Sequence, residues 1–569
     1  MTARPVNLLV FREGRRDVCV RDLKAHLVDQ LRRSEMQASF EQTVRLLLLA
    51  GELECGVADV IACGRPQSGA LGLESGLKAI TDTLAMALLG GGPDFSALSE
   101  TLQALVPAQI VPEHISISAP EGFAYYALHP LAYAGLVDKL PGLSSTVAVV
   151  GIRSIGTTLS AVVAAALRRQ GKNAGRITVR PHGHPYNREL RFSAAELQFV
   201  RSSIISGAGF LVIDEGPGLS GSSFLAVAEA LVRAGVALEK ITLICGHQPN
   251  FETFRSEDGA ARAKKFRWQP VDRSPRLPEG AGNFLGGGEW RRFLLPDQAA
   301  WPASWTSFER LKYGSLDAGS PRFYKFLGLG HYGDSVFIRE QKIAEAGFGP
   351  EPKHESHGFA SYQWIQGRTM RPVDLSDSVL DRLAQYCAFR ATSFPAELHD
   401  LNALQLMADH NLRELGFDVS VQLEFQRPVI ADGRMQPHEW LLSGNGKMLK
   451  TDSGSHGDDH FFPGLTDVAW DLAGAIVEWE MNPEQSAMFL DLYRQKSGDD
   501  ASSRIQHFIV AYSVFRAAYC LMAANALGEG DESRRFLAAA EKYKLYVSNP
   551  ERGEGSLPPR SLQIACTAK

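Results

Sequence analysis

The chain has 569 residues, of which 45% are hydrophobic, and a formal net charge of −5 at pH 7. This length exceeds what one hydrophobic core usually supports, so two or more domains are expected. This slightly negative net charge does not favour nucleic-acid binding.

The seven cysteines are scattered and show no CxxC spacing. This pattern favours a reducing compartment and gives no support to a structural zinc site. Apolar stretches look too short to span a membrane, and the early arginines leave no signal-peptide core. We therefore expect a cytoplasmic protein that acts on small molecules, without nucleic acid or membrane partners, and we leave homo-oligomer formation open.

The N-terminal part of the chain, up to about residue 140, predicts a helical extension. Helical runs alternate there with a glycine-rich break at 88–95. An aromatic stretch at 120–136 follows, and we expect most of its rings to pack in a core. A first strand–loop–helix unit then spans 145–171, with its loop at 151–157.

The polar stretch after the next predicted strand, 177–179, carries several arginines, histidines and a tyrosine over 180–188. The pair His182 and His184 invites a metal interpretation. Because no third or fourth ligand lies nearby in sequence, that signal is weak, and a plain polar loop is equally open.

The most informative stretch is FLVIDEGPGLSGSS, residues 210–223. Four apolar residues predict a buried strand that ends at Asp214 and Glu215, and a Gly, Pro and Ser loop precedes a helix from about Phe224. Such loops bind phosphate because backbone amides converge at the helix N-terminus. The converging amides are those of Ser220, Gly221, Ser222 and Ser223. The two carboxylates would repel an anion, so we expect them to bind sugar hydroxyls or Mg²⁺.

This segment resembles the 5-phosphoribosyl-1-pyrophosphate (PRPP) loop of type I phosphoribosyltransferases, in which a hydrophobic strand and two acidic residues precede a Thr/Ser-Gly-x-Thr/Ser turn. The resemblance implies that Asp214 and Glu215 bind the ribose hydroxyls and that 220–223 bind the 5-phosphate. The spacer 216–219 is one residue longer than usual. An ordinary strand-to-helix turn is the alternative.

The loop 151–157 is similar to the pyrophosphate loop of the same family. The resemblance implies that Arg153 meets the diphosphate charge, and that the stretch 180–188 is the mobile catalytic arm. The residues that would close on the diphosphate are Ser154, Gly156 and Thr157.

The composition changes after Cys245. Residues 262–305 are rich in Arg, Pro, Gly and Trp and show no steady period, which is typical of a domain boundary. We therefore predict a first domain over 1–265, a linker over 266–300 and a second domain over 301–569.

The start of the second domain, 322–352, predicts a strand, a glycine-rich turn and an amphipathic helix. Lys325 on the strand and Glu340 on the helix follow the arrangement that kinases use to place an ammonium on nucleotide phosphates. The Gly-x-Gly-x-x-Gly match at 328–333 follows the lysine, so the turn at 316–320 is the better-placed nucleotide loop. The stretch 359–370 predicts the last strand of a small lobe and a hinge.

The segment 434–479 resembles the aminoglycoside phosphotransferase and choline kinase-like family, whose H-G-D-x-x-P-x-N catalytic loop precedes a metal-binding Asp. Asp452 matches that metal-binding Asp. Asp471, in AWDLAG, resembles the residue that braces the catalytic loop. The resemblance implies ATP and Mg²⁺ as cofactors of this domain.

The middle of that motif departs from the family. One alignment puts Arg434 at the catalytic Asp and Glu439 at the metal-binding Asn. A shifted alignment makes Asp432 the catalytic base and His438 or Glu439 the metal ligand, while Asp432-Gly433 also fits a hairpin turn. Further acidic and histidine side chains could add metal ligands or form a solvated loop: His456, Asp458, Asp459 and His460.

Together these features predict an α/β protein in which a parallel-sheet phosphoribosyltransferase-like domain precedes a two-lobed α+β kinase-like domain. The resemblances imply a bifunctional transferase with Mg²⁺ as cofactor and PRPP and ATP as co-substrates. Two alternatives stay open. One is a PRPP and ATP sensor with degenerate sites, and the other is a nucleoside phosphorylase or hydrolase.

Overall fold

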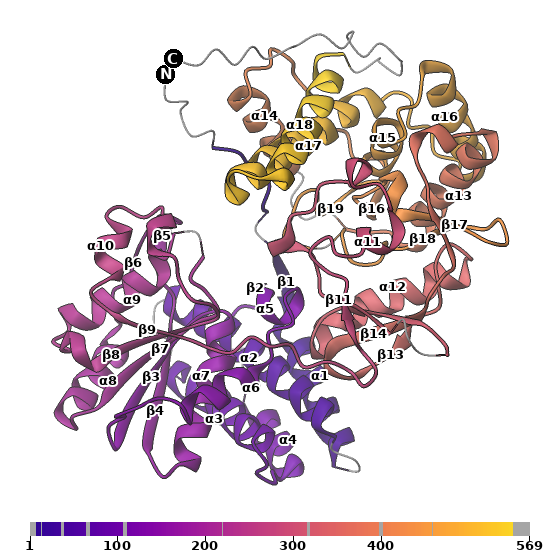
Figure 1. Ribbon diagram of the computed structural model, residues 1–569. Coiled ribbons are helices and arrows are strands. Elements are labelled where there is room, and N and C mark those ends of the chain that lie inside the picture. The colour runs from indigo at the N-terminus through magenta and orange to yellow at the C-terminus, as the bar shows by residue number, and fades with distance from the viewer. Residues whose placement is uncertain are drawn as a thin grey trace, which may run out of the picture.

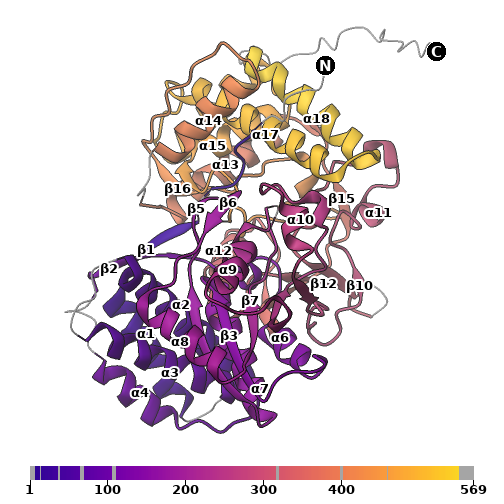
Figure 2. The ribbon, with the colours of Figure 1, turned by 90° about the vertical axis from the view of Figure 1, so that its left-hand side faces the viewer.

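The computed structural model describes residues 7–12, 14–35, 39–63, 69–105, 111–218, 220–315, 319–397, 402–457 and 459–549. Figure 1 shows a parallel sheet with its helices at the lower left and a second α/β region to the right, topped by the C-terminal helices. Figure 2 shows the same arrangement from the side, with the C-terminal helices above the parallel sheet.

The first region is built on a five-stranded parallel sheet of order β4–β3–β7–β8–β9. Its central strands β3 and β7 are buried over almost their whole length, which explains their unbroken apolar sequences. The strands are β3 (Thr146–Ile152), β4 (Asn173–Val179), β7 (Gly209–Ile213), β8 (Ile241–Cys245) and β9 (Arg267–Pro270).

Helices cover both faces of this sheet. Alternate residues of β3 and β7 point to opposite faces, so Val149 packs with α7 on one side and Val150 packs with α8 and α9 on the other. The helices of this region are α5 (Glu121–Ala124), α6 (Pro130–Val137), α7 (Ile155–Arg169), α8 (Ala194–Ile205), α9 (Ser222–Arg233) and α10 (Gly259–Ala263).

The helical extension joins the two regions. Its helix α2 is buried along most of its length, and its leucines share one core with Phe326 and Phe359 of the second region. The elements of the extension are β1 (Arg15–Cys19), α1 (Val20–Ser34), α2 (Phe40–Cys63), α3 (Ala70–Leu88), α4 (Phe95–Ala104) and β2 (His114–Ser118).

The second region begins with a five-stranded antiparallel sheet of order β10–β11–β12–β14–β13 that packs against α12. This small lobe agrees with the predicted strand, helix and last strand around Lys325. Its elements are β10 (Asn283–Phe284), β11 (Lys312–Ser315), β12 (Arg322–Phe326), α12 (Asp334–Glu345), β13 (Lys353–His354) and β14 (Phe359–Gln363).

A larger, mainly helical lobe follows, with Trp440, Trp470 and Trp479 in its core. Two small sheets, β15–β17–β18 and β16–β19, lie between its helices and the small lobe. Its elements are β15 (Gly367–Thr369), α13 (Asp377–Ser393), α14 (Asn402–Glu414), β16 (Pro428–Ile430), β17 (Trp440–Ser443), β18 (Met448–Lys450), β19 (Leu465–Asp467), α15 (Ala469–Glu478), α16 (Pro483–Ser497), α17 (Ile505–Leu527) and α18 (Asp531–Ser548).

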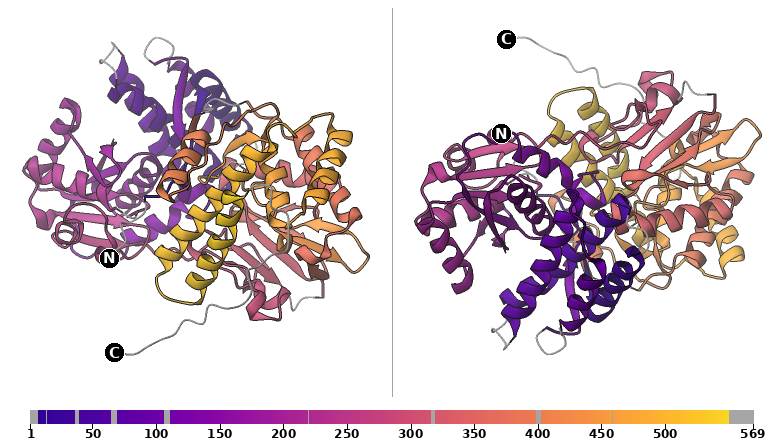
Figure 3. Two further views of the ribbon diagram at one scale, coloured as in Figure 1. Left: turned by 90° about the horizontal axis from the view of Figure 1, so that it is seen from above. Right: turned by 90° about the horizontal axis from the view of Figure 1, so that it is seen from below.

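Helix α17 corrects one expectation from the sequence. By length and composition it could cross a membrane, although 78% of its most apolar window is buried inside the protein. It runs beside α18 (Figure 3), and Phe508 and Tyr512 lie in the lobe's core. A central core helix gives the same apolar signal as a membrane span, because both must bury every face.

The observed boundaries differ from the predicted ones at three places. Strand β9 extends the parallel sheet to Pro270, and β10 at Asn283–Phe284 already pairs with β11, so the connection is shorter than 266–300. The N-terminal segment 7–12 packs on the large lobe, where the Phe462 amide donates to the Val10 carbonyl. Composition cannot reveal such pairings because they join residues far apart in sequence.

Candidate functional site

In the parallel-sheet domain, the two predicted loops meet at the carboxyl ends of neighbouring strands. Gly151 of β3 is in register with Ile213 of β7. The loop after β3 presses on the end of β7, because a Cβ atom on Gly156 would lie 2.6 Å from the Ile213 carbonyl oxygen. This packing explains the glycine at 156 and brings 151–157 beside Asp214.

The acidic pair Asp214 and Glu215 directly follows β7. The Gly122 amide donates to Glu215 Oε2 at 2.6 Å, and the Glu215 amide donates to Asp214 Oδ1 at 2.8 Å. Burial raises the pKa of Asp214 to about 7. Burial and the charge of Asp214 raise the pKa of Glu215 to about 7. Both carboxylates therefore lack enough donors or cations to stay charged easily.

The glycine–serine loop turns tightly into α9. Gly221 has φ of 63°, and an added Cβ would lie 2.3 Å from the Phe254 ring, so only glycine fits this position. Ser220 Oγ and Ser222 Oγ are 2.9 Å apart. Ser223 follows in the first turn of α9, where backbone amides lack partners within the helix.

The polar stretch 180–188 folds over this loop as the hairpin of β5 (His182–His184) and β6 (Asn187–Glu189). The Ser222 hydroxyl donates to the Pro185 carbonyl at 2.6 Å. The hairpin thus lies where the mobile arm was predicted. His182 and His184 are exposed, and the metal-ligand cluster found among the described residues does not include them.

Arg153 is placed differently from its expected role on a diphosphate. Its guanidinium is buried, and it donates to Thr178 Oγ1, the Thr178 carbonyl and the Ala58 carbonyl at 3.0, 2.8 and 3.2 Å. A further contact reaches Asp59. These contacts tie β3, β4 and α2 together and direct the side chain away from the loop. Ser154 immediately precedes α7, and Thr157 is buried in its first turn.

Other arginines act electrostatically on the acidic pair. The charges of Arg188 and Arg180 oppose the rise in the pKa of Asp214, and Arg273 does the same for Glu215. Arg273 lies in the segment predicted to be a linker. The sequence contains no local signal that Arg273 lies near Glu215, because only the tertiary fold brings the residues after β9 beside the end of β7.

In the second domain, Lys325 lies at the centre of a buried charge cluster. Its Nζ is 3.3 Å from Glu340 Oε1 and 2.5 Å from Asp452 Oδ1. Lys312 is the register partner of Lys325 on β11, and its Nζ is 3.1 Å from Asp452 Oδ2. Burial opposes ionisation of Asp452, but Lys325 and Lys312 hold the pKa of this carboxyl well below its usual range.

Asp432 lies opposite this cluster, on the irregular segment between β16 and a short 3-10 turn at Pro437–Glu439. Asp471 Oδ2 accepts from the Asp432 amide and Asp471 Oδ1 from the Gly433 amide, both at 2.8 Å. The Tyr386 hydroxyl donates to Asp432 Oδ2 at 2.5 Å. These contacts hold the backbone at Asp432 and Gly433 and the Asp432 carboxylate in place, while the catalytic role of Asp432 stays a prediction.

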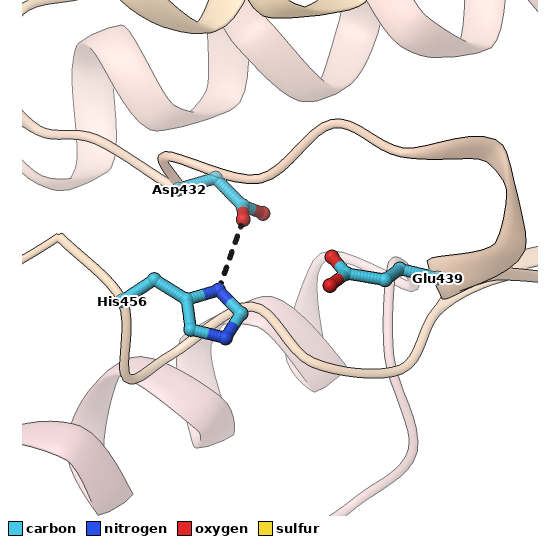
Figure 4. Close-up of side chains that lie close together, drawn as sticks. All are labelled: Asp432, Glu439 and His456. Atoms are coloured by element: carbon cyan, nitrogen blue, oxygen red, sulfur yellow. Dashed lines mark ion pairs between the residues drawn. The ribbon is translucent and has the colours of Figure 1, made fainter. Parts of the chain in front are cut away.

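A cluster of three side chains, one of which is Asp432, has the size of a cation site. Figure 4 shows Asp432 and His456 pointing at each other and Glu439 approaching from the other side. Their nearest ligand atoms all lie within 4.8 Å of one another. His438 is not in the cluster and stacks on Trp290, with ring centroids 5.8 Å apart.

These residues fit a metal unequally. Asp452 offers a buried carboxylate, but its two oxygens already pair with Lys325 and Lys312 at 2.5 and 3.1 Å. It fits Mg²⁺ only when these lysines move onto nucleotide phosphates, which would bring their own oxygen ligands to the ion. The Asp432, Glu439 and His456 set is less suitable, because Mg²⁺ prefers oxygen ligands only and because the Lys450 ammonium lies 2.7 Å from Glu439 Oε2.

Some predicted features serve packing or lie outside the described residues. An added Cβ on Gly328 would lie 2.7 Å from the Gly333 nitrogen, and one on Gly333 would lie 2.5 Å from the Gly328 carbonyl oxygen. The 328–333 glycines therefore form a compact turn. The predicted nucleotide loop 316–320 is described only at 319–320, and Asp458 is not among the described residues.

The two candidate sites approach each other at residues 121–126. Glu121 reaches solvent, yet the surrounding protein and the charges of Glu215 and Asp459 raise its pKa to about 7. Tyr126 Oη is 3.0 Å from His460 Nε2. Acidic side chains thus extend from Glu215 of the first domain to Asp459 of the second.

No model of a known protein family matches the chain, and no curated protein does. Among solved structures, the chain is similar to a choline/ethanolamine kinase family protein from Mesorhizobium loti, with 17% identity, coverage of 42% of this chain and 86% of that chain, and a TM-score of 0.31.

A choline kinase from Streptococcus pneumoniae has 15% identity, coverage of 41% and 90%, and a TM-score of 0.27. A spectinomycin phosphotransferase, solved with ADP and spectinomycin, has 11% identity, coverage of 42% and 85%, and a TM-score of 0.29. Because these TM-scores are low, the likeness by itself carries no functional argument.

Proposed function

We propose that the second domain is a phosphotransferase that moves a phosphoryl group from ATP to a hydroxyl group of a small molecule. The observation that carries this proposal is the buried Lys325, held by Glu340 on one side and Asp452 on the other at 3.3 and 2.5 Å. A lysine in this position of a kinase contacts the nucleotide phosphates. Here Glu340 and Asp452 already compensate its charge.

Asp432 would accept the proton from the attacking hydroxyl. Burial opposes its ionisation, but Lys450, His456 and Arg390 lower its pKa, so the carboxylate is charged and can act as a base. Asp471 would orient the Asp432 backbone through two amide hydrogen bonds. Mg²⁺ held by Asp452 would neutralise phosphate charge.

We propose a second function for the parallel-sheet domain, which is binding of PRPP and transfer of its phosphoribosyl group. The supporting observation is that loops 151–157 and 214–222 follow adjacent parallel strands, with a hairpin folded over the second loop. Asp214 and Glu215 would accept hydrogen bonds from ribose hydroxyls. The amides of the first turn of α9 would bind the 5-phosphate.

The fusion of the two domains in one chain motivates the hypothesis that one small molecule is the substrate of both steps. Glu121 is close enough to both Glu215 and Asp459 to sense their charges. A labelled ribosyl product that never passed to the ATP-dependent step would count against this hypothesis.

Mass spectrometry of a cell extract incubated with the protein, PRPP, ATP and Mg²⁺ tests both activities. Asp214→Asn should abolish ribosylated products, and Asp452→Asn should abolish phosphorylated ones. If neither variant differs from the parent, both assignments fall.

The second site also favours another candidate, a PRPP and ATP sensor, because Glu439 stands at the metal-binding Asn position of one alignment and pairs with the Lys450 ammonium at 2.7 Å. Calorimetric binding of both compounds without turnover across a broad acceptor screen would support the sensor. Release of free ribose or ribose phosphate would instead support a phosphorylase or hydrolase.

A further inference from the structure

A buried lysine lies inside the candidate metal cluster of the second domain. Lys450 ends strand β18 and is 1% exposed. Its Nζ is 2.7 Å from Glu439 Oε2, 2.7 Å from the Asp452 carbonyl oxygen and 3.5 Å from Asp432 Oδ2. An ammonium has three N–H donors, and each finds an oxygen within reach here.

The backbone holds this ammonium in place. The Lys450 amide donates to the Phe348 carbonyl at 2.6 Å, which fixes the end of β18 against the small lobe. The side chain enters the space between the segment that carries Asp432 and the turn that carries Glu439. The strand geometry therefore directs the ammonium into the cluster.

The same space is the one that a metal ion would need. Asp432, Glu439 and His456 bring ligand atoms within 4.8 Å of one another. A divalent ion among these atoms would face the positive charge of Lys450 at short range, with little water to screen the repulsion. The cluster can hold the ammonium or a metal ion, and this chain supplies the ammonium.

We propose that Lys450 is a built-in cation that takes the place of a metal ion between Asp432 and Glu439. The role that we give to this cation, which is to hold the two carboxylates in position for catalysis, rests on the proposed phosphotransferase function. Unlike a metal ion, the ammonium carries one charge and cannot dissociate. Glu439 is therefore a positioning residue for Lys450 and not a metal ligand in this protein.

The test is a titration of the full chain with Mn²⁺ alone, in which electron paramagnetic resonance measures free Mn²⁺. Lys450→Met keeps an unbranched side chain, one heavy atom shorter, but removes its charge, so the variant should bind Mn²⁺ at least tenfold more tightly than the parent. Adding Glu439→Gln should abolish that gain. Lys447→Met, an exposed lysine on the same hairpin, is the matched control and should leave Mn²⁺ binding unchanged.

A folded Lys450→Met protein with no gain in Mn²⁺ binding would overturn the proposal. If this variant does not fold, Glu439→Gln in the parent chain decides. Unchanged Mn²⁺ binding supports a lysine at the site, and weakened binding shows that Glu439 is a metal ligand and overturns it. Calorimetry with a non-hydrolysable ATP analogue is read separately, because absence of nucleotide binding would reject the phosphotransferase function without altering the Mn²⁺ result.

Discussion

The first candidate site holds partly buried carboxylates and the second holds buried ones, and their charge balance is opposite. At the first site, burial raises the pKa of both Asp214 and Glu215 to about 7. At the second, lysines hold the pKa of Asp452 well below its usual range despite burial. The first site therefore depends on a ligand to supply donors or cations, whereas the second is neutralised by the protein itself.

This difference suits the proposed ligands. Ribose hydroxyls donate hydrogen bonds and would stabilise the charged form of Asp214 and Glu215. Nucleotide phosphates are anions and would compete with Asp452 for Lys325 and Lys312. Binding of these ligands would thus complete the first site and rearrange the ion pairs of the second.

The largest expected effect comes from removing the central cation of the second site. Lys325→Met should lower phosphoryl transfer about 100-fold or more, because a buried charge aimed at the phosphates is lost. Steady-state kinetics with ATP measures this. Lys342→Met, an exposed lysine on α12, is the control and should be nearly neutral. Equal activities would show that Lys325 serves folding alone.

Removing the brace of Asp432 should weaken both stability and activity. Asp471→Ala leaves the amides of Asp432 and Gly433 without acceptors, and we expect a loss of about 3 kcal/mol in the free energy of unfolding. Urea denaturation measures it. Asp467→Ala also removes the acceptor of two backbone amides, those of Gln426 and Arg427, and an ion pair with Arg504, but lies away from Asp432. That control should lose stability without losing activity per folded molecule.

The folded protein should become more stable when the negative charge of Glu215 is removed from the first site. The pKa of Glu215 rises from 4.5 to about 7, so its contribution to folding is complete below pH 4.5 and is lost as the pH rises to about 7. Glu215→Gln should therefore raise the free energy of unfolding at pH 8 by about 1 to 2 kcal/mol, after allowance for partial exposure. At pH 4 the parent and variant should match. A variant that is less stable at pH 8 would contradict the raised pKa.

The smallest expected effect concerns the hairpin over the first site. Ser222→Ala removes the hydrogen bond to the Pro185 carbonyl and should cost about 1 kcal/mol locally. Hydrogen exchange of the amides at 182–189 should become several-fold faster in the variant. Unchanged exchange would mean that other contacts hold the hairpin.

Local sequence determined the parts of each site that lie along one strand or helix. The apolar run that ends in Asp214–Glu215 predicted the end of a strand, and Lys325 with Glu340 predicted a strand followed by a helix. These predictions succeed because strand burial and helix periodicity are local properties of the chain.

Tertiary structure alone decided how the charged side chains pair. Arg153 turns to the carbonyl groups of β4 and α2, Lys312 joins Lys325 through strand register, and Arg273 reaches the acidic pair from beyond β9. Lys450 enters the cluster of Asp432 and Glu439 in the same way. Long charged side chains can reach many partners, so only the packing of distant segments selects among them.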